Sequence, residues 1–323
     1  MRMRFCALTL LVLLAIAGGA SGHSPKPDRR KNTQQVERTM AVTPRVAVSV
    51  CVVSGDLTVR GWERNEVRAR STDGTQIELT RNDQLTSQPA TELQVTAGGG
   101  HRTHPNASCF PSADIELDVP RGASIKLQTS SGDISVTEVA RVDAGSQSGD
   151  IALVKVHGEV NLNTISGEIS VRDSSGSFKL HTVGGGIEAH NLISNGSADG
   201  LAAATVGGEV TLDHLQMPNI KVNTVSGEMN YIGTLSRAGR YNFQSISGRM
   251  GLALPKDSSF RLSASLGEAV KFNTDFNLTY SENQTISGVS SHGGFHRLEA
   301  TAGSGSSVIT VSLLEGTVQI SRR

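Results

Sequence analysis

The chain has 323 residues, in which 30 Lys and Arg balance 30 Asp and Glu, and aromatic residues make up only 4%. Zero net charge provides no strong field for a polyanion, and few aromatic side chains are present to stack on bases, so nucleic-acid binding is not expected. The 35 glycines, set among short stretches rich in β-branched residues, predict many tight turns between short strands.

The first residues have the three parts of a secretory signal peptide. Two arginines lie in residues 1–4, an apolar run covers residues 5–17, and small residues fill positions 18–22. This order is typical of export signals, whereas a transmembrane helix needs about 20 apolar residues. We expect residues 1–22 to direct export, with an uncleaved anchor as the alternative. No transmembrane span is expected in the mature chain, which would lie in the periplasm or at the cell surface.

Two regions precede the main repeat. Residues 23–40 are polar and charged, so a disordered leader is predicted there. Residues 41–122 begin with one repeat-like pair of strands, and four alternating segments with longer spacers follow it. We expect this N-terminal β region to be an antiparallel cap, because an open strand edge at the end of a repeat array invites aggregation.

A short motif recurs through residues 123–323. Residues 163–171 have the sequence Asn-Thr-Ile-Ser-Gly-Glu-Ile-Ser-Val, residues 223–229 have Asn-Thr-Val-Ser-Gly-Glu-Met, and weaker copies occur every 17 to 23 residues. Such a period is typical of solenoid repeats. Apolar residues alternate on both sides of the Gly, which indicates two half-buried strands joined at a Ser-Gly corner. The expected corner glycines, where a positive φ costs little, are Gly55, Gly132, Gly149, Gly167, Gly185, Gly208, Gly227 and Gly248.

Stacking would supply the partners that a single two-strand repeat lacks. Equivalent apolar positions would then form one ladder of Ile134, Ile151, Ile169, Ile187, Val210, Met229 and Met250. We therefore predict an all-β, β-helix-like β-solenoid of short two-strand repeats, in preference to an antiparallel β-sandwich. Two strands within residues 307–320 are expected to finish the far end, after a long loop over residues 273–305.

Two cysteines remain after processing, Cys51 and Cys109. An oxidising compartment permits a disulfide, but the sequence does not show whether their Cα atoms lie close enough. A disulfide and two free thiols both stay open. A cysteine nucleophile is not expected, because no histidine stands at a recognisable spacing.

An acidic residue follows the corner glycine in five repeats: Asp133, Asp150, Glu168, Glu209 and Glu228. Stacked like charges repel, and such a row could recruit Ca²⁺. However, Gly186 and Arg249 interrupt the row, and the Gly-Gly-x-Gly-x-Asp calcium repeat is absent. We interpret the row as a solvated edge without a metal. Because the acids occupy the repeating position itself, they do not predict the carboxylate pair of a polysaccharide-cleaving enzyme.

Histidines offer two short spacings, His101 with His104 and His292 with His296. Neither pair has a nearby Cys or acidic residue that would complete a zinc set. The remaining mature-chain histidines that fall in the repeats are interpreted as exposed strand or corner residues: His157, His181, His190 and His214. No phosphate-binding loop or nucleophile elbow is present. We therefore predict no cofactor, no metal and no catalytic residue.

Several stretches resemble a bacterial family of proposed adhesins of unknown function, whose members are exported. One is Ser-Gly-Asp-Leu-Thr-Val-Arg-Gly-Trp at residues 54–62, and another is Asp-Val-Pro-Arg-Gly at residues 118–122, followed by Ser-Gly-Asp at residues 131–133. The resemblance covers nearly the whole mature chain, although residues 184–186 and Arg249 lack the acidic position. It implies a β-helix-like fold and an envelope location, and says far less about function.

These observations predict a non-catalytic envelope protein, either adhesin-like or a scaffold, with a glycan or a protein as its partner. The reason is a long repetitive surface rich in Ser, Thr, Asn and Gly, which suits extended contact. One alternative is a regulatory protein that binds a membrane stress sensor. A polysaccharide-active β-helix enzyme is less favoured.

Overall fold

The computed structural model describes residues 36–83, 88–98, 109, 111–281 and 295–323, which all belong to the unit Thr33–Arg323. Every regular element in these ranges is a β-strand. The chain is thus all-β, as the glycine-rich alternating pattern predicts. The predicted signal peptide lies outside the described residues. β1 begins at Val36, so the predicted leader, residues 23–40, extends too far at its C-terminal end.

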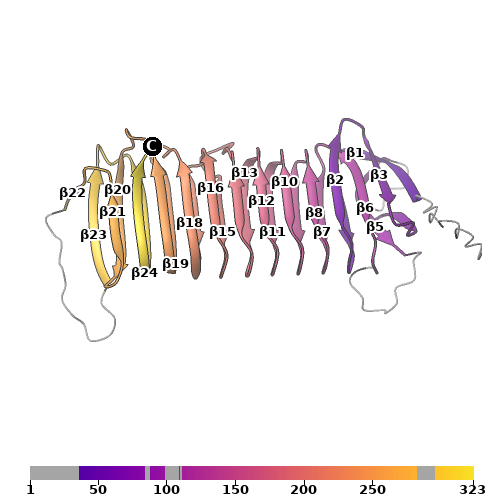
Figure 1. The fold of residues 1–323 in the computed structure, drawn as a ribbon. Coiled ribbons are helices and arrows are strands. Elements are labelled where there is room, and N and C mark those ends of the chain that lie inside the picture. The colour runs from indigo at the N-terminus through magenta and orange to yellow at the C-terminus, as the bar shows by residue number, and fades with distance from the viewer. Residues whose placement is uncertain (1–35, 84–87, 99–108, 110, 282–294) are drawn as a thin grey trace, which may run out of the picture. The chain divides into compact units, whose positions relative to one another are not determined.

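The strands form two ladders along one axis (Figure 1). The leading ladder contains the strands that come before each Ser-Gly corner, and the trailing ladder contains those that come after it. The leading strands are β1 (Val36–Cys51), β7 (Ser124–Gln128), β9 (Arg141–Gly145), β11 (His157–Asn163), β13 (Ser175–His181), β15 (Gly200–Ala204) and β17 (Asn219–Asn223). The trailing strands are β2 (Leu57–Trp62), β8 (Ile134–Thr137), β10 (Ile151–Val154), β12 (Ile169–Arg172), β14 (Ile187–His190), β16 (Val210–Leu215) and β18 (Ser226–Gly233). Two longer strands, β19 (Arg240–Leu254) and β24 (Ser307–Arg322), continue from one ladder into the other.

Equivalent strands of successive repeats pair in parallel and in register. The predicted apolar ladder is confirmed: Ile134 pairs with Ile151, Ile151 with Ile169, and the series continues without a slip through Ile187, Val210, Met229 and Met250. A slip of one residue would turn each apolar side chain to the solvent, so the alternation itself fixes this register.

The core lies between the two ladders. Inward positions of both ladders form one cluster of buried residues that extends from Val42 to Ile320. Most of its members are Val, Ile, Leu and Ala, and the larger rings gather around β18 and β19, where the centroids of Tyr231 and Phe243 lie 5.6 Å apart. Stacking therefore gives each thin repeat a continuous core.

Strand order departs from chain order at the N-terminal end of the stack. β5 (Ala90–Ala97) and β6 (Ile115–Pro120) form a coil outside β1 and β2, and both pair with them in parallel. Two antiparallel strands follow: β4 (Ile77–Arg81) pairs with β5, and β3 (Glu66–Ser71) pairs with β6. The antiparallel part of the predicted cap is thus limited to β3, β4 and the start of β1. β1 and β2 pair directly with β7 and β8, so no structural break separates residues 41–122 from the solenoid.

The C-terminal end is also out of order. β24 lies between β19 and β20 (Phe260–Gly267), and it pairs with β21 (Lys271–Thr274) as well. The end is finished by β23 (Phe295–Ala302) and β22 (Thr279–Tyr280), which are antiparallel. The prediction that residues 307–320 finish the stack is therefore wrong, and the region predicted as a long loop contains two strands. Alternation identified the strands, but it carries no information on which neighbour each one pairs with.

Candidate functional site

All eight predicted corner glycines stack along one edge of the solenoid. A Cβ added to Gly149, Gly167, Gly185 or Gly208 would lie 1.8–1.9 Å from the carbonyl oxygen of the preceding corner glycine. The backbone φ is positive at only half of the eight, Gly55, Gly132, Gly227 and Gly248. Close approach between coils therefore requires glycine at all eight corners, whereas a positive φ favours glycine at only four of them. The same stack includes Gly316, which sequence reasoning missed because Leu-Glu precedes it in place of Val-Ser or Ile-Ser.

Buried threonines form hydrogen bonds with the backbone of the corners. Thr182 donates its hydroxyl to the Gly167 carbonyl at 3.0 Å and accepts a hydrogen bond from the Gly185 N–H at 3.2 Å. Thr164 and Thr205 repeat this arrangement one coil away on either side. A hydroxyl that is both donor and acceptor satisfies two backbone groups that a buried corner would otherwise leave unpaired.

The acidic row beside the corners holds successive coils together. The carboxylate of Asp56 accepts a hydrogen bond from the backbone N–H of Asp133 at 2.9 Å, Asp133 accepts one from Asp150 at 2.9 Å, and Asp150 accepts one from Glu168 at 2.7 Å. The row then ends at Gly186, and Glu228 lies 3.8 Å from Arg249. A carboxylate that already accepts a backbone N–H has a structural role, which favours our interpretation of this edge as one without a metal.

The electrostatic consequence of the row appears at Glu168. Its pKa is raised above the ordinary value, first by burial and then by the negative charges of Glu188 and Asp150, while Arg172 opposes the shift. Like charges one strand apart disfavour ionisation.

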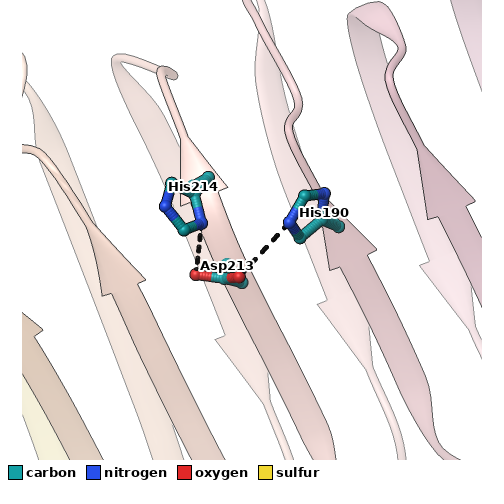
Figure 2. A group of neighbouring side chains, drawn as sticks. All are labelled: His190, Asp213 and His214. Atoms are coloured by element: carbon teal, nitrogen blue, oxygen red, sulfur yellow. Dashed lines mark ion pairs between the residues drawn. The ribbon is translucent and has the colours of Figure 1, made fainter.

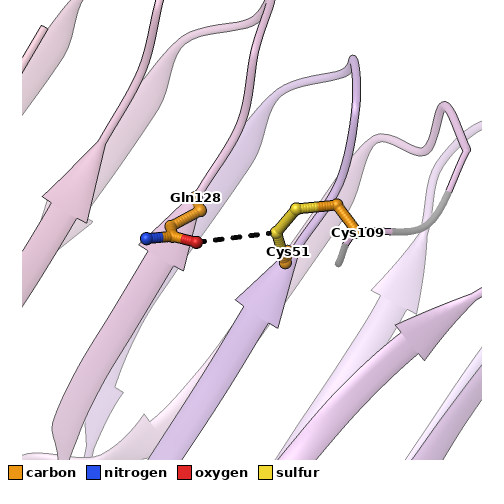
Figure 3. Close-up of a disulfide and its surroundings, with 3 residues drawn as sticks. All are labelled: Cys51, Cys109 and Gln128. Carbon is orange, nitrogen blue, oxygen red and sulfur yellow. Dashed lines mark hydrogen bonds between the residues drawn. A yellow bond between two sulfur atoms is a disulfide. The ribbon is translucent and has the colours of Figure 1, made fainter. Parts of the chain in front are cut away.

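Cys51 and Cys109 form a disulfide with their Cα atoms 4.7 Å apart (Figure 3). The bond joins the end of β1 to the segment that leads into β6, so it links two coils that are 58 residues apart in sequence. Gln128 Oε1 lies 3.8 Å from Cys51 Sγ, but a disulfide sulfur carries no hydrogen to donate.

Of the two short histidine spacings noted in the sequence, neither has both of its histidines among the described residues. His101, His104 and His292 lie outside the described residues. His296 is an exposed residue of β23, opposite Leu266 of β20.

A groove runs along the axis over the outer face of the leading ladder. It has a volume of about 950 Å³ and crosses successive coils. Its charged lining residues are Arg45, Arg141, His157, Glu159, Lys179 and Asp199. Two smaller hollows of about 470 and 390 Å³ share residues with it, Arg141 on one side and Lys179 on the other. The depression is therefore continuous over this face.

The outer face of the leading ladder is mostly polar from β7 to β17, and Ala202 and Ala204 of β15 are its apolar exceptions. Outward positions hold Lys126, Arg141, Lys179 and Lys221 among many amides and hydroxyls, and these strands present no outward Phe, Tyr or Trp. Such a face offers hydrogen bonds and charge to a ligand, but no aromatic ring on which a sugar would stack. Outward alternation was visible in the sequence, but the groove depends on how neighbouring coils are offset, which periodicity does not show.

An apolar row runs along the corner edge. Ile165, Val183, Val206, Val225 and Ile246 each precede a Ser-Gly or Gly-Gly corner, and they are 39–52% exposed. Leu314 extends the row beyond Ile246 at 41% exposure, whereas Val53, which is 50% exposed, is separated from Ile165 by the polar residues Ser130 and Gln147. Stacking on one another buries part of each side chain, and the remainder is a contiguous apolar strip of the kind that marks interaction surfaces.

The fold defines a parallel β-solenoid with two strands per coil and no helix in its described parts. Residues 54–321 match the family described as Toastrack DUF4097, and the chain belongs to this family. No curated protein matches the chain. Within the part of the chain that the structure describes, no helix is long and apolar enough to cross a membrane.

Three solved structures are similar in outline, and each match covers 90% of this chain. A proposed cell adhesion protein from Clostridium sporogenes ATCC 15579 is 11% identical, is covered over 100% of its length and has a TM-score of 0.27. A proposed adhesin from Bacteroides fragilis NCTC 9343 is 12% identical, is covered over 97% and has a TM-score of 0.39. A proposed lipid-binding protein from Parabacteroides distasonis ATCC 8503 is 12% identical, is covered over 98% and has a TM-score of 0.41.

Proposed function

We propose that this protein is an exported, non-catalytic binding or scaffold protein of the bacterial cell envelope, and that an extended glycan lies along the groove of the leading ladder. The observation that carries the proposal is the continuity of the groove over successive coils. An extended polymer can repeat the same contact from coil to coil, because the coils themselves repeat at strand spacing.

The chemistry of the groove supports a polar ligand. Arg141 and Lys179 bring positive charge to its floor, while the amides of Asn161 and Asn195 offer both donors and acceptors. The acids of the corner row are a different set and lie along another edge. The carboxylates of Asp56, Asp133 and Asp150 accept backbone N–H groups, so these acids support a structural role more than a catalytic one.

A second candidate is a regulatory protein that binds a protein partner, such as a membrane stress sensor. The apolar row favours it, because half-exposed β-branched side chains in five coils offer a dry contact that a glycan does not need. In this case the corner edge, and not the groove, would carry the affinity.

The test is co-sedimentation of the mature chain, from residue 23, with cell-envelope fractions of its own organism, with and without a Ca²⁺ chelator. A groove variant carries Arg141→Ser and Lys179→Ser, and a row variant carries Val206→Ser and Val225→Ser. Each pair lies on the surface and serves as the control for the other. We expect saturable binding that the groove variant weakens at least five-fold and the row variant leaves unchanged.

The opposite pattern would transfer the binding to the corner edge and favour a protein partner. Loss of binding on chelation that added Ca²⁺ restores and Zn²⁺ does not would assign a metal to the acidic row. Absence of binding to every fraction would refute the glycan proposal. Release of products from a panel of polysaccharides, abolished by changing one carboxylate, would show an enzyme instead.

A further inference from the structure

Two histidines from successive coils meet on the trailing ladder. His190 is the last residue of β14, and it pairs in register with Asp213 of β16, which His214 follows directly. His190 and Asp213 are 23 residues apart in sequence, which is one coil of the solenoid at this point, and His214 is one residue further on. A search for short spacings could not detect them, but a search at the repeat period would.

Both rings face the carboxylate between them (Figure 2). His214 Nδ1 lies 2.7 Å from Asp213 Oδ1, and His190 Nε2 lies 3.4 Å from Asp213 Oδ2. The three ligand atoms all lie within 4.8 Å of one another. No other group of three His, Cys, Asp or Glu ligands gathers in this way among the residues that the structure describes.

One further feature favours a bound cation at this cluster. Asp213 Oδ1 is buried but accepts no well-aligned hydrogen bond in the described structure, although His214 Nδ1 is close to it. An ionised oxygen shielded from water is costly without a partner. The left-handed φ of 54° at His214 recurs at the same corner of other coils, at Asp173 and Asn191 among others, so it belongs to the repeat and does not by itself mark the site.

The positive charge of Arg172, which neighbours His190 on the adjacent strand, is already engaged. Arg172 pairs in register with His190 from the coil on the other side, and its guanidinium lies 2.9 Å from Glu188. Arg172 therefore leaves the approach to the Asp213 carboxylate open to another cation.

We propose that His190, Asp213 and His214 bind a divalent transition-metal ion, with Zn²⁺ as the ion of choice. Two imidazoles and one carboxylate are a donor set that zinc favours, and three protein ligands leave a fourth position for water or for a group of a partner. Tetrahedral ligands at the usual zinc distances lie about 3.3 Å apart. The ligand atoms lie within 4.8 Å of one another, so binding would bring them closer by up to about 1.5 Å. The imidazole side chains are 50% and 61% exposed, so an ion can enter without opening the fold.

The experiment measures Zn²⁺ binding to the untagged mature chain by competition with a chromogenic chelator, in the presence of millimolar Mg²⁺. We expect one site per chain that Mg²⁺ does not occupy, because imidazole ligands disfavour hard cations. His190→Gln, Asp213→Asn and His214→Asn should each weaken binding at least ten-fold. Asparagine suits position 214 because Asn191 has a φ of 53° at the same corner of the preceding coil.

His157→Asn is the matched control, since His157 is an exposed histidine three coils from His214 that contacts Ser175 and no carboxylate. Its affinity for Zn²⁺ should equal that of the unchanged chain. Co²⁺ substitution adds a spectroscopic readout, because a tetrahedral N₂O site gives visible absorption that the three cluster variants should lose. Equal Zn²⁺ affinity in the triple variant and the unchanged chain would overturn the proposal, as would an unchanged chain that binds no Zn²⁺ at micromolar concentration.

Discussion

Adjacent glycines in one corner provide a sharp test of the stacking argument. A Cβ on Gly208 would lie 1.8 Å from the carbonyl oxygen of Gly185, whereas a Cβ on Gly207 would meet nothing within 4 Å. Neither residue has a positive φ, so a difference between their alanine variants cannot come from backbone strain. The two substitutions are chemically identical and one residue apart, and only the approach of the neighbouring coil differs.

The magnitude follows from the size of the overlap. Real Cβ atoms do not approach a carbonyl oxygen closer than about 3 Å, so Gly208→Ala must displace one coil from the next by more than 1 Å. That movement would break ladder hydrogen bonds on both sides. We expect a loss of about 3 kcal/mol or more in the free energy of unfolding. Gly207→Ala should be neutral, or should stabilise by about 0.4–1 kcal/mol through the unfolded state.

The assay is thermal and urea unfolding followed by circular dichroism, with hydrogen exchange at the corners as a local readout. At this chain length, 3 kcal/mol corresponds to a decrease in Tm of about 5 °C. Gly185→Ala and Gly184→Ala repeat the comparison one coil away, because a Cβ would meet Gly167 O at 1.9 Å in the first and Ile165 O at 3.6 Å in the second. Equal Tm values within either pair would refute the stacking argument.

Four further predictions test other parts of the structure. Replacing Cys51 and Cys109 by Ser should cost about 4 kcal/mol by loop-closure entropy for a separation of 58 residues, and reduction of the unchanged chain should lower its Tm to the same value. Thr182→Val should cost about 1–3 kcal/mol in urea unfolding because it leaves a corner N–H unpaired, whereas Thr182→Ser should cost less than 1 kcal/mol. The raised pKa of Glu168 means that the folded state holds its proton more tightly than the unfolded state does, so this group contributes stability at low pH that is lost as the pH rises through the folded pKa. Glu168→Gln should therefore stabilise the protein by about a few tenths of a kcal/mol at pH 7 and have no effect below the ordinary pKa of Glu. A constant effect at all pH values would contradict this. Deletion of residues 307–323 removes a central strand of both ladders, and should yield aggregated chain in size-exclusion chromatography, where simple fraying of an end would leave a folded monomer.

Periodicity in the sequence was sufficient to predict the strands and their register in the middle of the fold. The alternation around Ile169 and Met229 sets which side chains point inward, and the repeat sets which of them stack, so ladder and register could both be predicted. The corner glycines could be located in the same way. Their physical reason could not, because the close approach of Gly208 to Gly185 depends on contact between coils, and a motif within one coil does not contain it.

The ends and the candidate sites could be predicted less well. Nothing in the residues of β5 or β24 shows that each pairs with a strand distant in sequence, because alternation is the same for parallel neighbours in any order. The disulfide was left open for the same reason, since the proximity of Cys51 to Cys109 follows from the position of β6 beside β2. His190 and Asp213 were missed because a metal-ligand spacing was sought within one loop, whereas a solenoid brings together residues that are one coil apart.

The out-of-order strands give the two ends a role that the repeats cannot have. Neighbouring repeats contact one another over short sequence distances, so an array built in chain order would lose its last coil first. Here β24 pairs with β19 in both ladders, and with β20 and β21 beyond it, so the outer C-terminal coil has no parallel neighbour until the end of the chain is in place. At the other end, β5 and β6 pair with β1 and β2 on their outer side, and the disulfide links the end of β1 to the segment before β6. Long-range pairing at the ends thus makes unfolding of the whole stack cooperative. The groove begins over β1 at the N-terminal end and extends over the regular coils, where the backbone is held on both sides and an extended ligand would meet a surface fixed in advance.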